Sequence, residues 1–193
     1  MNFRIFSALL LVTSLFVAGC NNSSSTPPAK TTTALLSVEA IEAGTKGFTV
    51  GSPMSTRTVY VFFDAQCPHC SALWYAAKPL KSQAKFVWIP VGILNAASTS
   101  QGATILASSD PAAAMDAHEA SMMSKGGGIS ASSDADAQKD AIKKNTELMT
   151  SFGFASIPSI VAKHAQTGEL VRQEGAMPTA ALASFLGLQV PVQ

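Results

Sequence analysis

The alternation of apolar and polar residues after position 34 predicts helices interleaved with strands. Residues 34–43 place apolar side chains at helical spacing and predict a short helix. Residues 48–50 fit an edge strand. The continuous apolar runs at 59–63 and 86–91 are typical of strands that are buried on both faces. These runs indicate the centre of a sheet.

The rest of the chain carries further helix and strand patterns. We expect helices at 71–83, 100–123, 137–152 and 178–186, and short strands at 160–162 and 170–171. Pro79 predicts a kink, and Asp110 with Pro111 predicts a new helix start inside the second helix. Gly153 fits a helix C-terminal cap, and residues 126–136 fit a loop. This order predicts an α/β sandwich with a mixed sheet and a helical insertion.

The first residues have the pattern of an export signal. A short positive start precedes fourteen apolar residues at 5–18, too few for a membrane-spanning helix. The run ends in Val17-Ala18-Gly19-Cys20, which resembles the lipobox of bacterial lipoproteins. We therefore expect a signal peptide at 1–19 and a lipid on Cys20. An ordinary signal peptide with an incidental cysteine is the alternative.

Residues 20–33 are rich in Ser, Thr, Asn and Pro and predict a flexible tether after the lipidated cysteine. By resemblance to lipoprotein sorting, Asn21 favours delivery to the outer membrane of a bacterium with two membranes. We therefore expect a periplasmic, lipid-anchored protein.

Charge and cysteine content narrow the function. The formal net charge is +1, and the basic residues are scattered, so we expect no nucleic-acid partner. The chain has 3 cysteines, and Cys20 is assigned to the lipid. The other two form a single CxxC, which favours redox chemistry over a disulfide scaffold.

The motif Cys67-Pro68-His69-Cys70 directly follows the first buried strand. A structural zinc site usually needs four ligands, and no second CxxC exists, so we expect no metal here. At a strand-to-helix junction the helix N-terminus stabilises a Cys67 thiolate, which makes Cys67 the attacking thiol and Cys70 the resolving thiol. Pro68 suits the first helical turn, and His69 can place positive charge beside the thiolate.

Residues 60–70 resemble the active-site strand of the DsbC/DsbG group of disulfide isomerases, including an acid, Asp64, three residues before the first cysteine. Residues 105–111 resemble part of the helical insertion of DsbG. Ile157-Pro158 falls where this group has its cis-proline, and residues 175–178 fall at its last turn. The resemblance implies a thioredoxin-like catalytic domain at 34–193, a cis Ile157–Pro158 bond facing the substrate, and thiol:disulfide oxidoreductase activity without a cofactor.

Three features differ from that group. Residues 21–44 leave no room for an N-terminal dimerisation domain, so we expect a monomer. The dipeptide Pro68-His69 matches DsbA, and Ile157 stands where DsbG has a threonine. The implied partners are thiols and disulfides of exported proteins and a DsbB-like or DsbD-like membrane redox protein.

Two alternative functions remain at this stage. The first is a DsbG-like reductase of oxidised cysteines. The second is a thioredoxin-fold copper chaperone, because His118 and Met122 are one helical turn apart, with Met115 and Met123 nearby. Trp74 and Tyr75 fit either a substrate groove or core packing.

Overall fold

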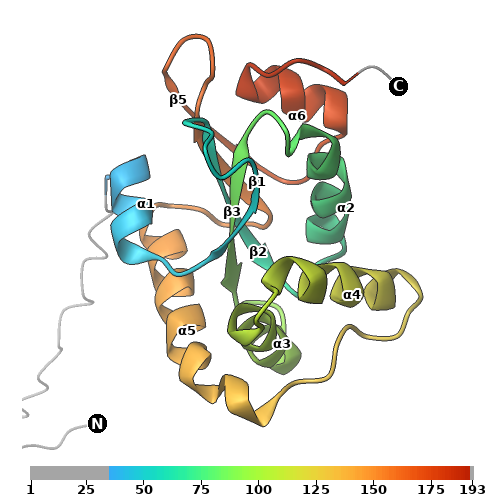
Figure 1. Ribbon diagram of the computed structural model, residues 1–193. Helices are drawn as coiled ribbons and strands as arrows, with labels where there is room; N and C mark the ends of the chain where they lie inside the picture. The colour runs from blue at the N-terminus through green and yellow to red at the C-terminus, as the bar shows by residue number, and fades with distance from the viewer. Residues whose placement is uncertain (1–34, 192–193) are drawn as a thin grey trace, which may run out of the picture. The chain divides into compact units, whose positions relative to one another are not determined.

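The computed structural model describes residues 35–191, which form a sheet covered by helices (Figure 1). The strands are β1 (Phe48–Gly51), β2 (Thr58–Asp64), β3 (Lys85–Val91), β4 (Ser159–Lys163) and β5 (Leu170–Glu174). The α-helices are α1 (Val38–Gly44), α2 (Pro68–Ala77), α3 (Ala96–Ala107), α4 (Pro111–Met123), α5 (Asp136–Ser151) and α6 (Thr179–Leu186). The predicted signal peptide at 1–19, Cys20 and most of the tether lie outside the described residues.

The sheet is mixed, as predicted, with the strand order β1-β3-β2-β4-β5. Strands β2 and β3 are parallel, and the register pairs Phe62 with Ile89. The other pairs are antiparallel, and β1 is an edge strand as expected. The parallel pair therefore ends at the same edge of the sheet, and this edge carries the CxxC.

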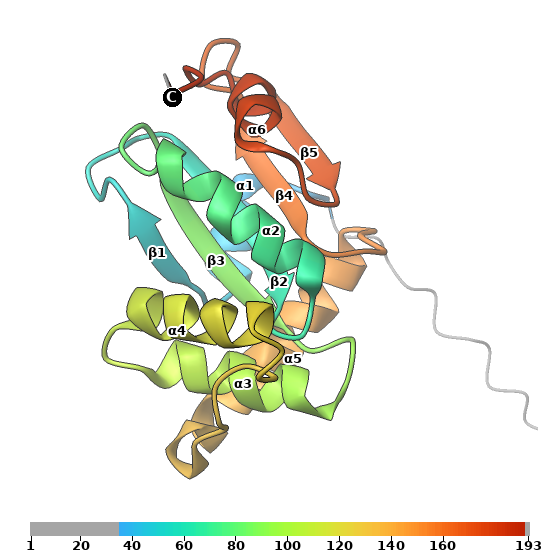
Figure 2. The same ribbon diagram turned by 90° about the vertical axis from the view of Figure 1, so that its right-hand side faces the viewer.

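Alternate residues of the central strands face two different cores, which explains the continuous apolar runs. Phe63 and Trp88 pack on the face covered by α2 and α6, and Phe62 and Ile89 pack on the face covered by α1 and α5. The helices α3 and α4 form the insertion after β3 and lie side by side at one end of the sheet (Figure 2).

The helix predicted at 71–83 is shorter and begins earlier. It starts at Pro68, because the Cys67 side chain caps it, and ends at Ala77. A 3₁₀ turn over Lys78–Leu80 follows, so the predicted kink at Pro79 is wrong. Proline has no N–H to continue the helical hydrogen bonds and instead helps to end the helix.

Other boundaries also move by a few residues. Helix α3 begins at Ala96, because the side chain of Asn95 accepts the N–H groups of Ala97 and Ser98. Asp110 caps α4 as predicted, accepting the N–H of Ala113 at 3.0 Å. The predicted loop ends in a 3₁₀ turn at Ser133–Ala135, which leads into α5.

Gly153 follows α5 with a φ of 78°, as its predicted role in ending that helix requires.

Among the described residues, no helix is both long enough and apolar enough to cross a membrane.

Candidate active site

The turn between β2 and α2 is held by Asp64, a fully buried carboxylate. Its Oδ1 accepts the N–H of Gln66 at 2.8 Å, and its Oδ2 accepts the N–H groups of Ile93 at 2.8 Å and Leu94 at 3.1 Å. The Asp64 carbonyl also accepts the N–H of Cys67 at 3.0 Å. One acid thus joins the CxxC turn to the loop after β3 through hydrogen bonds from backbone N–H groups.

Cys67 is the N-cap of α2. Its Sγ accepts the N–H of Cys70 at 3.3 Å, and the side chain is 6% exposed. The pKa of Cys67 is lowered from 9.0 to about 6, chiefly by a hydrogen bond with the Cys70 side chain and against the cost of burial. The N–H groups of Cys70 and His69 and the charge of His69 add to this effect. Cys67 therefore carries a thiolate at neutral pH, which is the reactive form of cysteine.

Cys70 lies one turn further along α2 and is fully buried. Burial raises the pKa of Cys70 well above its ordinary value, and the neighbouring Cys67 raises it further. The two thiols are free in this structure. The pair thus combines a Cys67 thiol of lowered pKa with a Cys70 thiol of raised pKa behind it. The roles of attacking and resolving thiol stay a prediction.

Pro68 and His69, the two residues between the cysteines, are both exposed. Pro68 occupies the first position of α2, as expected. Among the effects on the pKa of Cys67, the charge of His69 is the smallest of those resolved. Most of the lowering therefore comes from Cys70 and the start of the helix, and His69 contributes less than the motif suggested.

The Ile157–Pro158 peptide bond is cis, which confirms the expected geometry. The Ile157 carbonyl oxygen lies 3.9 Å from Sγ of Cys67, so this loop borders the reactive sulfur. The loop is anchored from β5, where Glu174 accepts the N–H groups of Ala155 and Ser156. The backbone beside the cysteine is therefore held in place.

His118, proposed from the sequence as a copper ligand, is fully buried in α4. Its Nδ1 accepts the N–H of Ile129 at 3.2 Å, so the proton sits on Nε2, which bonds the Ala65 carbonyl at 2.6 Å. A Cβ at Gly128 would collide with this ring. Both ring nitrogens are occupied, and the described residues hold no cluster of three or more His, Cys, Asp or Glu suited to a metal. His118 here ties α4 to the CxxC turn.

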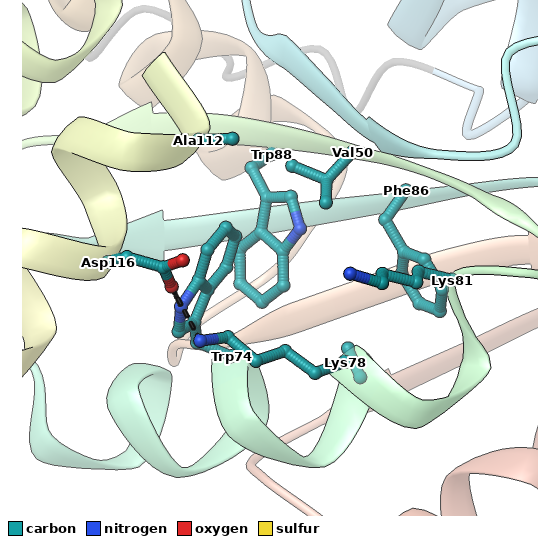
Figure 3. Close-up of a pocket in the computed structure, with 9 residues that line it drawn as sticks. Val50, Trp74, Lys78, Lys81, Phe86, Trp88, Ala112 and Asp116 are labelled. Carbon is teal, nitrogen blue, oxygen red and sulfur yellow. Dashed lines mark hydrogen bonds and ion pairs between the residues drawn. The ribbon is translucent and has the colours of Figure 1, made fainter. Parts of the chain in front are cut away.

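Trp74 is a core residue whose other side borders a cavity of about 170 Å³ (Figure 3). Its ring meets Trp88 edge-on at 4.9 Å, and its Nε1 donates to Asp116 at 2.7 Å. Lys78 pairs with the same Asp116 oxygen at 2.6 Å. Tyr75 is 36% exposed. Of the two interpretations from the sequence, core packing describes Trp74.

Glu119 is the site residue that the sequence did not reveal. It is 1% exposed on α4, and the Ser71 hydroxyl and the charge of Cys67 both act on its pKa. A single glutamate in an alanine-rich helix carries no signal of which helix face is buried.

Comparisons with known proteins agree with this geometry. A family model described as a thioredoxin-like domain matches residues 52–189. The thiol:disulfide interchange protein DsbG of Pseudomonas aeruginosa is 35% identical over 143 residues, 71% of this chain and 54% of that protein. DsbG of Escherichia coli is 34% identical over 107 residues, 53% of this chain and 42% of that protein. The chain thus spans about half the length of these relatives.

Among solved structures, a periplasmic thioredoxin-like protein from Salmonella enterica serovar Typhimurium has the same fold, with a TM-score of 0.59 and 17% identity. The match covers 80% of this chain and 97% of that protein. The family match spans most of the folded part, including both cysteines and the cis-proline loop. The chain belongs to the thioredoxin-like family.

Proposed function

We propose that this protein is a thiol:disulfide oxidoreductase that exchanges disulfides with exported proteins through Cys67 and Cys70. The observation that carries the proposal is the pairing of an outer cysteine, whose pKa is lowered to about 6, with a fully buried second cysteine. The match to two thiol:disulfide interchange proteins supports it.

In this mechanism the Cys67 thiolate attacks a client disulfide and forms a mixed disulfide, which Cys70 then resolves. The start of α2, with Pro68 and His69, favours the thiolate. The backbone of Ile157 beside Pro158 offers groups for strand-like pairing with the client peptide. An apolar groove next to α2 fits a client side chain; its lining is Ala72, Ala76, Ala176, Met177 and Pro178.

The location and partners belong to the same proposal. The export pattern and Cys20 support a lipid-anchored protein in the periplasm, and the periplasmic structural relative agrees with this location. We propose that a DsbB-like or DsbD-like membrane protein resets the cysteine pair, and that the folded part is a monomer.

Trapping of clients tests the assignment of the two thiols. Cys70→Ala removes the resolving thiol, so mixed disulfides through Cys67 should accumulate in cells and disappear on reduction. Cys67→Ala should trap none, although it is the matched substitution in the same motif. Equal trapping by both variants, or trapping by Cys67→Ala alone, would contradict the proposed roles.

A further inference from the structure

Glu119 is an unexplained group beside the cysteine pair. Its side chain is buried, and neither carboxyl oxygen has a partner in hydrogen-bond geometry among the described residues; the Ser71 hydroxyl comes close enough to lower its pKa but does not complete such a bond. A buried carboxyl without partners is costly, more so when it is ionised. A buried titratable group beside a reactive cysteine is a candidate for a role in the chemistry of the site.

The ionisable neighbours of Glu119 come from one direction. Helix α4 packs against α2, α3 and β1, and neither α3 nor β1 contains an ionisable side chain. At the start of α2, Cys67 and the Ser71 hydroxyl act on Glu119, whereas the ionisable side chains of α2 itself, His69, Cys70 and Tyr75, do not shift its pKa. The charge of Cys67 is therefore the charge that shifts the pKa of Glu119.

The other charged groups of this region already have partners. On α4 itself, both nitrogens of His118 are hydrogen-bonded, and Asp116 is paired with Lys78 of α2. At the end of β2, Asp64 accepts backbone N–H groups. None of these groups supplies a cation to Glu119.

Glu119 and Cys67 lose their protons in overlapping pH ranges. Burial, with a smaller contribution from the Cys67 charge, raises the pKa of Glu119 to about 7, and the Ser71 hydroxyl opposes this shift. The pKa of Cys67 is about 6. Two negative charges in one buried site disfavour each other, so an ionised Cys67 favours a protonated Glu119.

We propose that Glu119 carries one of the two protons of the exchange reaction, a role that rests on the function proposed above. In the reduced protein Cys67 is a thiolate, Cys70 is a thiol and Glu119 is a neutral carboxyl. When Cys67 becomes part of a disulfide its sulfur is uncharged. Glu119 then ionises more readily, and since burial still holds its pKa above the ordinary value, its proton leaves at pH values near neutrality.

The atoms and electrons balance. The Cys67 thiolate attacks a client disulfide, forming a Cys67–client bond and releasing one client thiolate. Cys70 loses its proton and attacks Sγ of Cys67, which closes the Cys67–Cys70 disulfide and releases the second client thiolate. Two electrons pass to the client, and its two thiolates take up two protons, one from Cys70 and one from Glu119. In the opposite direction the same groups accept both protons of a client dithiol.

The proton count gives a measurable pH profile. Two glutathione thiols that reduce the protein disulfide bring two protons. If Cys70 and Glu119 keep both, the equilibrium constant is nearly independent of pH. If Cys70 keeps one proton and the second proton is released to water, the equilibrium constant for reduction rises about tenfold per pH unit wherever Cys67 is fully ionised.

The experiment equilibrates the full-length protein with reduced and oxidised glutathione between about pH 6.5 and 7.5, where Cys67 is mostly ionised. For the wild type we expect the constant for reduction to change by at most about threefold, and for Glu119→Gln by about eightfold. Glu147→Gln is the control: it makes the same change on an exposed residue of α5 and should match the wild type.

A second measurement does not depend on the variant folding. Infrared difference spectra of wild-type protein labelled with ¹³C at its glutamate carboxyls should show a protonated carboxyl that decreases on oxidation. Equal pH profiles for wild type and Glu119→Gln, or an unchanged carboxyl signal where that variant does not fold, overturn the role of Glu119 and leave thiol exchange intact. If Cys67 and Cys70 do not equilibrate with glutathione at all, the proposed function fails, and the role of Glu119 fails with it.

Discussion

Replacing Cys67 by serine should remove a large part of the pH dependence of the stability of the reduced protein. The folded-state pKa of Cys67 is about 6, against an ordinary value of 9.0, so between these values the unfolded chain binds more protons at this position. The contribution of Cys67 to stability therefore rises with pH across this range and is lost as the pH falls through about 6.

The magnitude follows from the width of the pH interval. Each pH unit inside the range contributes about 1.4 kcal/mol, and Cys67 is buried enough that screening by water does not cancel this. Between pH 7 and 8.5 the reduced wild type should gain about 2 kcal/mol relative to Cys67→Ser. This window separates Cys67 from its neighbours. The raised pKa of Glu119, about 7, makes its contribution to stability fall as the pH rises from its ordinary pKa, and most of that fall is complete by pH 7. The raised pKa of Cys70 changes the stability only at higher pH, near and above the ordinary pKa of a cysteine.

Urea unfolding of both proteins under reducing conditions at several pH values measures the difference. Oxidised wild-type protein is the control, because its Cys67 cannot ionise, and it should lack the Cys67-dependent gain as Cys67→Ser does. Parallel stability curves for reduced wild type and Cys67→Ser from pH 7 to 8.5 would refute the lowered pKa of Cys67.

Three further changes test single contacts. His69→Tyr should raise the pKa of Cys67 by less than about one unit, because the His69 charge is the smallest resolved effect; thiolate absorbance measures it, and a larger rise would contradict this ranking. His118→Leu leaves the Ala65 carbonyl and the Ile129 N–H unpaired and should cost about 2–5 kcal/mol in urea unfolding; a neutral change would count against the structural role. Cys20→Ser should abolish acyl labelling and membrane association, and labelling that persists would exclude Cys20 as the lipid site.

The central strands and the CxxC could be predicted because their signals are local. Phe62 and Phe63 are consecutive and both fully buried, in cores on opposite faces of the sheet, which is what a continuous apolar run indicates. The CxxC follows that run directly, so its place at a helix start was also predictable. Pro158 was identified through the family resemblance, since an isolated X–Pro pair does not specify a cis bond.

The part of the site formed by the insertion could not be predicted from the sequence. The sequence does not reveal that α4 packs against α2, and therefore gives no sign that the charge of Cys67 acts on Glu119. For the same reason the spacing of His118 and Met122 suggested a copper site. The structure instead brings Ala65 and Ile129 to the His118 ring. Both positions depend on contacts between elements that are far apart in the sequence.

The proposed chemistry depends most directly on the difference in acidity between Cys67 and Cys70. Alkylation of the reduced full-length protein with iodoacetamide over a range of pH, with the modified residue identified by mass spectrometry, measures it. We predict that Cys67 reacts with a midpoint near pH 6, and that Cys70 stays unmodified well above its ordinary pKa. If Cys70 reacts first, or if both thiols react with a midpoint near 9.0, Cys67 is not the activated nucleophile.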